Sequence, residues 1–371
     1  MSMLQIEKLS KVYKSGTFGG GMKPALRQVS FDMQKGEVVS LIGESGSGKS
    51  TLGKIILRLV TASGGRVMFE GTNIIGLKKG QLHDYYRNVQ GVFQDPFSSY
   101  NPLYKADRVL ELVRQEYLGD LSAKEWDHKL HLALETVALN PADVLNKFPH
   151  QLSGGQQQRL LVARALLLDV KLLIADEIIS MLDASTRVDV LNMLVDLKRK
   201  GLAVLFITHD LSLGNYISDR TVILRYGAVV EMGDTDKVFG NPQHSYTKHL
   251  LTAVPQLHRK WHDADADRAA ANGSSGHGAQ LSTGYGAAAV AEDRQAQRYS
   301  KSPLNPLKTA TAAPETGQAG GPRPSLMDLP NQSWQSRFHL GGGPSMAAVM
   351  AANAPPELVP FEEGHLVAVE E

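Results

Sequence analysis

Residues 43–50 read GESGSGKS, and this octapeptide constrains the fold of the chain more than any other stretch. The apolar run EVVSLI precedes it and the helix-like run TLGKIILRLV follows it, so a buried strand should enter the loop and a helix should leave it. The three glycines let the backbone curl until its N–H groups converge on an anion, and the helix N-terminus adds partial positive charge. This order predicts a phosphate-binding loop within an α/β fold.

The apolar runs EVVSLI, GVFQ, KLLIAD and AVLFIT are each followed by a turn or a helical pattern, which is typical of a parallel sheet. We therefore expect an α/β P-loop NTPase (RecA-like) core. The opening stretches LQIEKLSKVY, LRQVSFDM and GRVMFEG alternate like antiparallel strands and predict a smaller N-terminal β subdomain. Residues 103–150 are mostly helical in period, which predicts a helical subdomain inserted over about 96–165.

Beyond about residue 262 the composition shifts to Ala, Gly, Ser, Pro and Gln. Such a segment buries too little apolar area to offset its ordering entropy, so residues 262–320 should be mostly a flexible linker. We expect one domain over 1–255 and a largely flexible extension over 256–371. Within that extension, SLMDLPNQSWQSRFHL and ELVPFEEGHLVAV are apolar enough to dock.

Charge and composition exclude several function classes. Lys and Arg number 39 and Asp and Glu number 38, so the net charge of +1 offers no broad attraction to nucleic acid. The sequence has no cysteine, which excludes disulfides, thiolate catalysis and cysteine-ligated metal centres. The most apolar long run, LLVARALLLDVKLLIAD, contains Arg164, Asp169 and Lys171, and the N-terminus lacks the apolar region of a signal peptide. Any membrane role should come from docking onto another subunit.

Two groups of residues should hold ATP and Mg²⁺ at the loop. Lys49 should reach the β and γ phosphates and Ser50 should ligate Mg²⁺. The run LLIADE ends in Asp176, which should hold Mg²⁺, and Glu177, which should polarise the attacking water, because strand ends face the ligand crevice in α/β sheets. The loop residues expected to bind nucleotide are Gly43, Glu44, Ser45, Gly46, Ser47, Gly48, Lys49, Ser50 and Thr51.

Three further residues could complete this site. Gln94, in GVFQDPF, could contact Mg²⁺ and the water, and His209, in AVLFITHD, could contact the γ-phosphate. Tyr13 could stack on adenine. Taken singly, each also fits an ordinary structural residue.

The stretch LSGGQQQR, residues 152–159, has the glycines and hydroxyl of a phosphate cradle but no lysine. Locally it reads as a polar helix start near Gln156, capped by Ser153. Together with GESGSGKST, Gln94, LLIADE, SMLD and His209, it makes residues 1–255 resemble an ABC-type ATPase subunit. The resemblance implies that each ATP lies between two chains, with Ser153, Gly154, Gly155, Gln156 and Asp183 contacting it from the chain opposite the phosphate loop. The missing lysine would come from the other chain.

FQDPFSSYNPLY, KFPHQLSGGQQQR and NPQHSYTKHLLTAVP further resemble the oligopeptide/dipeptide permease ATPases, a subgroup that also serves nickel and oligosaccharide importers. This implies a second ABC ATPase subunit, identical or not, two transmembrane permease subunits and an extracytoplasmic solute-binding protein. The location implied is the cytoplasmic face of the plasma membrane. One departure is Ile178–Ile179, where the family usually has Pro-Thr. An exporter, a non-transport ABC ATPase and a guanine-nucleotide switch remain alternatives, although NKFP lacks the aspartate of a guanine-reading motif.

Overall fold

The computed structural model describes residues 2–14, 21–252, 349, 350 and 352–369. The linker expected over 262–320 and the stretch SLMDLPNQSWQSRFHL lie outside the described residues. Within these ranges no helix is both long and apolar enough to cross a bilayer.

An eight-stranded sheet forms the centre of the fold, in the order β11-β12-β10-β9-β3-β8-β7-β6. Its parallel part consists of β9 (Arg220–Arg225), β3 (Val38–Ile42), β8 (Ala203–Thr208), β7 (Leu172–Asp176) and β6 (Val89–Val92). Every residue of β3, β7 and β8 is buried, because helices cover both faces of a parallel sheet. The predicted parallel core is confirmed.

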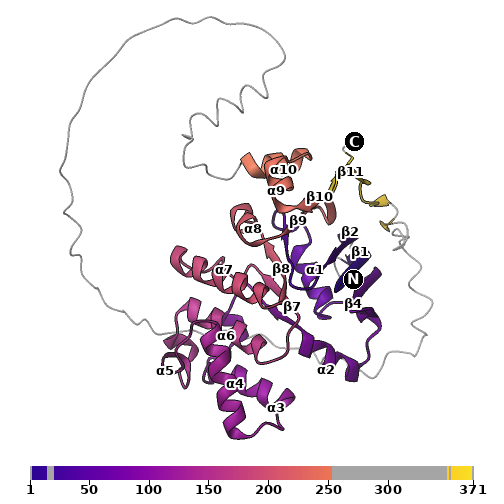
Figure 1. Cartoon of the computed structure of the whole chain (residues 1–371). Coiled ribbons are helices and arrows are strands. Elements are labelled where there is room, and N and C mark those ends of the chain that lie inside the picture. The colour runs from indigo at the N-terminus through magenta and orange to yellow at the C-terminus, as the bar shows by residue number, and fades with distance from the viewer. Residues whose placement is uncertain (1, 15–20, 253–348, 351, 370–371) are drawn as a thin grey trace, which may run out of the picture. The chain divides into compact units, whose positions relative to one another are not determined.

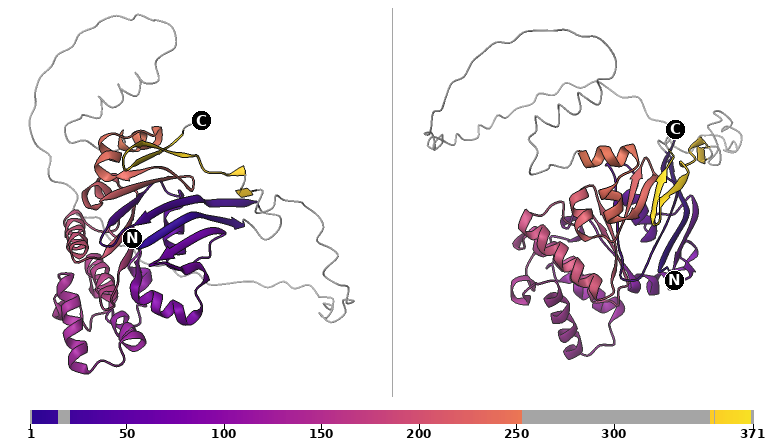
Figure 2. Two further views of the ribbon diagram at one scale, coloured as in Figure 1. Left: turned by 45° about the vertical axis from the view of Figure 1, so that its right-hand side comes forward. Right: turned by 45° about the horizontal axis from the view of Figure 1, so that its top comes forward.

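The antiparallel N-terminal layer is also confirmed. It is a four-stranded sheet in the order β2-β1-β4-β5, formed by β2 (Met22–Met33), β1 (Leu4–Lys14), β4 (Gly64–Phe69) and β5 (Thr72–Asn73). Its buried residues, such as Leu9 and Met33, share one apolar cluster with Leu41 of β3 and Leu52 of α1 (Lys49–Ile56). This cluster joins the two sheets around the helix that follows the phosphate loop (Figure 2).

The chain between β6 and β7 is helical, as predicted, and Figure 1 shows α3 to α5 projecting away from the sheets. Between β5 and β6 lie η1 (Ile74–Gly76) and α2 (Lys79–Asn88). Between β6 and β7 lie η2 (Phe97–Ser99), α3 (Arg108–Tyr117), α4 (Ala123–Thr136), α5 (Pro141–Val144), η3 (Pro149–Gln151) and α6 (Gly154–Leu166). Ser122 and Glu125 form a capping box that starts α4, since each side chain accepts the other residue's backbone N–H.

The remaining helices are α7 (Ala184–Arg199), α8 (Leu211–Ile217), α9 (Thr235–Gly240) and α10 (Ser245–Thr252). The apolar stretch ELVPFEEGHLVAV forms the hairpin of β11 (Leu358–Glu362) and β12 (His365–Ala368), drawn in yellow in Figure 1. Strand β12 pairs antiparallel with β10 (Ala228–Asp234), with Glu231 opposite Val367. The hairpin thus extends the central sheet beyond β10.

Candidate nucleotide-binding site

The phosphate loop connects the end of β3 to the start of α1, as the sequence predicts. Gly48 lies at φ 107°, and a Cβ at this position would stand 2.4 Å from the carbonyl oxygen of Ala25. Gly46 lies at φ 81°. These are conformations that residues with a Cβ adopt rarely, so the loop can take this path only with glycine at these positions.

Replacing Gly48 by Ala should weaken ATP binding by about tenfold or more, because the loop must shift to relieve both the strained φ and the clash with Ala25. Isothermal titration with a non-hydrolysable ATP analogue measures the loss. Gly71→Ala is the matched control, since Gly71 also has a positive φ of 80° but no neighbouring atom within 4 Å of its Cβ position. Equal affinities in the two variants would contradict this role of the loop.

Lys49 holds the loop closed on itself. Its Nζ donates to the carbonyl oxygens of Gly43 at 2.6 Å and Glu44 at 2.9 Å. Burial lowers the pKa of Lys49, and the negative charges of Glu177 and Asp176 oppose that shift. The ammonium group therefore lies between the loop and the two acids, where a phosphate chain would need a positive charge.

Ser50 and Asp176 meet at the start of α1. The Ser50 Oγ donates to Asp176 Oδ1 at 3.2 Å, and Asp176 is buried at the end of β7. Burial raises the pKa of Asp176, the hydrogen bond from Ser50 opposes this, and the charge of Glu177 raises the pKa further. The raised pKa means that the buried negative charge of Asp176 is disfavoured, and a bound cation would stabilise it. One hydroxyl and one carboxylate also match the oxygen ligands that Mg²⁺ takes beside phosphates, so these residues fit the ion.

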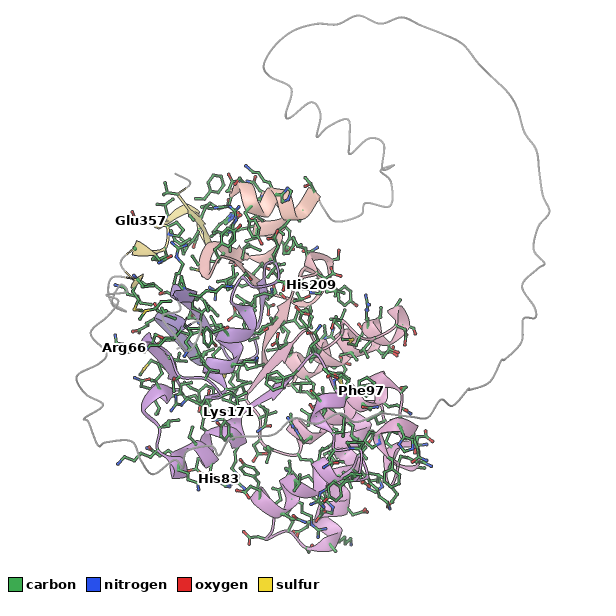
Figure 3. The ribbon with its side chains drawn as sticks, turned by 180° about the vertical axis from the view of Figure 1, so that it is seen from behind. Arg66, His83, Phe97, Lys171, His209 and Glu357 are labelled. Atoms are coloured by element: carbon green, nitrogen blue, oxygen red, sulfur yellow. The ribbon has the colours of Figure 1, made fainter. Side chains whose placement is uncertain are left out.

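Glu177 and His209 face each other at the ends of neighbouring strands. His209 Nδ1 lies 3.1 Å from Glu177 Oε1, and the Glu177 backbone N–H donates to Ile207 of β8. Glu177 adopts φ 51°, an uncommon conformation for a residue other than glycine. His209, labelled in Figure 3, is largely exposed, whereas the Glu177 side chain is mostly buried. A strained backbone like that of Glu177 is often found at functional positions.

A cavity of about 800 Å³ brings most of the predicted nucleotide residues together. Tyr13, Gln94, Glu177 and His209 line it together with Gly43, Glu44, Ser45, Gly46, Gly48, Lys49, Ser50 and Thr51. Ser47 is buried instead of lining the cavity. The predicted residues that line the cavity therefore come from the phosphate loop and from four other segments of the chain.

The stretch LSGGQQQR lies elsewhere in the fold. Ser153 caps α6, accepting from the Gln156 N–H at 3.2 Å, while Gln156 Oε1 accepts from the Ser153 N–H at 2.9 Å. The helix starts at Gly154, slightly earlier than the position near Gln156 that we expected. Among the described residues, the cavity lining includes none of Ser153, Gly154, Gly155, Gln156 and Asp183. Within one chain, the start of α6 thus lies apart from the cavity at the phosphate loop.

The first turn of α6 packs against the first turn of α7. Asp183 caps α7, accepting from both the N–H and the hydroxyl of Thr186 at 2.9 Å, and these hydrogen bonds hold the pKa of Asp183 well below its usual range. A Cβ on Gly155 would lie 2.4 Å from Thr186 Cγ2. The glycine therefore lets α6 approach the residues that Asp183 organises.

Comparisons with known proteins show the family to which the chain belongs. The ABC transporter family model matches residues 26–180, and the model of the oligopeptide/dipeptide transporter C-terminal region matches residues 230–278. The oligopeptide transport ATP-binding protein OppF of Bacillus subtilis (strain 168) is 45% identical over 238 residues, which cover 63% of this chain and 77% of OppF. The chain belongs to the ABC transporter ATP-binding proteins.

A second relative is the glutathione import ATP-binding protein GsiA of Escherichia coli (strain K12), 45% identical over 62% of this ABC chain and 37% of GsiA. Among solved structures, the ATP-binding cassette MJ0796, dimeric after hydrolysis and bound to ADP and Pi, is 30% identical with a TM-score of 0.57. It matches over 63% of this chain and 99% of its own. The cbiO1 protein of Clostridium perfringens, part of the cbiONQ transporter complex, is 25% identical with a TM-score of 0.57. The match covers 65% of this chain and 91% of cbiO1.

The departure from the usual ABC sequence after Glu177 is accommodated by burial. Ile178 and Ile179 are both buried in the large apolar cluster that includes Leu182. The Ser180 N–H donates to the Glu177 carbonyl at 3.1 Å, so a turn forms without a proline. The two isoleucines therefore face the protein interior and leave the Glu177 carboxylate beside His209.

Sequence reasoning missed two residues of α10 at the ABC site. The Glu44 N–H donates to the hydroxyl of Tyr246 at 3.0 Å, and Leu250 lines the cavity. Both belong to NPQHSYTKHLLTAVP, which we used only as a mark of the family. Their i, i+4 spacing places them on one face of a helix, and this was the available signal.

Proposed function

We propose that the chain is an ATP-hydrolysing subunit that energises an ABC importer of oligopeptides or similar peptide-like solutes. The observation that carries this is the pairing of Ser50 with Asp176 and of Glu177 with His209 around one phosphate loop. The match to the oligopeptide/dipeptide transporter C-terminal region, and the relatives OppF and GsiA, support the solute class.

In this proposal the loop amides and Lys49 bind the phosphates of ATP. Ser50 and Asp176, together with Gln94, which lines the same cavity as Ser50, would hold Mg²⁺, which neutralises phosphate charge when bound. Glu177 polarises the attacking water, and His209 keeps the carboxylate oriented and lies where it could contact the γ-phosphate. Tyr13, 40% exposed at the cavity, is available to stack on adenine. Positioning and electrostatics would then account for most of the rate enhancement.

We further propose that each nucleotide site is completed between two chains. Ser153, Gly154, Gly155 and Gln156 of one ABC subunit would contact the ATP held by the phosphate loop of another, with Asp183 beside them. The separation of α6 from the cavity within one chain supports this, as does the dimeric state of the related cassette MJ0796. The partners would be a second ABC ATPase, two transmembrane permease subunits at the cytoplasmic face of the membrane, and indirectly a solute-binding protein.

Uptake in a strain lacking the chromosomal gene tests the proposal. The wild-type chain should restore uptake of a labelled tripeptide, and Lys49→Ala should not, because the loop loses the charge that faces the phosphates. Lys78→Ala, a change at an exposed residue outside the site, is the control. Restored uptake of nickel or an oligosaccharide in place of the tripeptide would contradict the solute class. Full uptake with Lys49→Ala would contradict the role of the site.

A further inference from the structure

Helix α10 contacts the phosphate loop directly. The Tyr246 hydroxyl accepts the N–H of Glu44, the second residue of GESGSGKS. The tyrosine ring is buried, with 4% exposed, and the guanidinium of Arg225, at the end of β9, lies 4.8 Å from the ring centre. Ring packing and the cation on its face therefore fix where the hydroxyl can lie.

The start of α10 is anchored in turn to a buried carboxylate. Glu231 of β10 is fully buried, and its two oxygens accept the backbone N–H groups of Gln243 at 2.8 Å and His244 at 3.1 Å. The Tyr246 N–H donates to His244 Nδ1 at 3.0 Å. A buried carboxylate is tolerated only when it is well partnered, so Glu231 constrains the loop that leads into α10.

The C-terminal hairpin supplies the third partner of this carboxylate. His365 of β12 is fully buried, and its Nε2 lies 2.8 Å from Glu231 Oε1. The two residues are 134 positions apart in the sequence. An unbroken series of hydrogen-bonded groups thus runs from the hairpin through β10 and α10 to the phosphate loop.

We propose that Tyr246 is a positioning residue for the phosphate loop and that Glu231 and His365 hold it in place. The glycines of the loop leave its backbone free to adopt many conformations, and ordering it on binding costs entropy. The hydrogen bond from the Glu44 N–H to the fixed Tyr246 hydroxyl removes part of this freedom before ATP binds, so the loop binds nucleotide more tightly. The inference rests on the proposed nucleotide site.

Tyr246→Phe tests the first step, because it removes the hydroxyl and keeps the ring. Its dissociation constant for a non-hydrolysable ATP analogue should rise by about three- to tenfold, the loss expected for one hydrogen bond. Amide hydrogen exchange in residues 43–50 should also accelerate. Tyr85→Phe is the matched control, since the buried Tyr85 hydroxyl donates to the Ile56 carbonyl at the far end of α1. A purely structural role would lower the Tm of either variant without changing its affinity.

His365→Leu tests the second step, because it keeps much of the side-chain volume but cannot bond to Glu231. The affinity for the ATP analogue should fall, as in Tyr246→Phe. In the double variant, the fold-loss of affinity should be smaller than the product of the two single fold-losses. Val359→Ala, on the neighbouring strand β11, is the control. Wild-type affinity in either folded test variant would overturn the proposal. A wild-type chain that does not bind the analogue would overturn the proposed function as well.

Discussion

Glu177→Gln should lower the steady-state ATPase rate by about a hundredfold or more while ATP still binds. The substitution keeps the shape of the side chain but removes the charge beside His209 that we propose polarises the attacking water. Phosphate release measures the rate, equilibrium binding measures the affinity, and gel filtration with ATP should reveal a trapped closed dimer. The same preparation of ABC subunits, with its partner ATPase present, serves for every variant.

The control for this experiment is Glu70→Gln, which removes a carboxylate that pairs with Lys171 at the surface. Its ATPase rate should match the wild type, because exposed ion pairs of this kind contribute little to stability. A Glu177→Gln variant that hydrolyses ATP at the wild-type rate would exclude Glu177 as the residue that activates water.

Ser153→Arg should impair hydrolysis at the phosphate loop of the opposite chain and not at its own. In a mixed dimer with one loop inactivated by Lys49→Ala, we expect about a hundredfold loss when Ser153→Arg lies on the chain with the inactive loop. The long side chain would occupy the N-terminus of α6, where the other chain's ATP is expected. On the chain with the active loop, the same substitution should leave the rate nearly unchanged. Phosphate release from dimers purified through two tags measures both arrangements.

Ser122→Arg is the matched control for the loss of a helix cap. Ser122 starts α4 with the same reciprocal arrangement with Glu125 that Ser153 has with Gln156. The two substitutions should cost similar stability, about 1 kcal/mol, but only Ser153→Arg should affect catalysis. The opposite assignment of losses between the two mixed dimers would reject a site shared by two chains.

Local features were sufficient to predict the core of this ABC ATPase. Continuous apolar runs predicted β3, β7 and β8, because a strand buried on both faces has no polar side. The glycine loop, with a strand before it and a helix after it, predicted where Lys49 and Ser50 lie. The acids and the histidine at strand ends followed from the rule that ligands bind there in parallel sheets.

Contacts between distant segments could not be predicted in this way. Nothing in the periodicity of ELVPFEEGHLVAV indicates that β12 pairs with β10, because strand partners are chosen by register over long separations. The same holds for Tyr246 and Glu44, and for the pair of Glu231 and His365. Each depends on groups brought together only after the sheets have assembled. The roles of the individual site residues remain predictions that the variants above address.

The hairpin's position has a consequence for how the polypeptide matures. Translation releases β10 well before Leu358 is made, so in the meantime that strand has no neighbour on its outer side. Unpaired strands of this kind invite association with other chains. During synthesis the outer edge of β10 is therefore open to association with other chains, and a chain terminated before β12 would keep that edge unpaired.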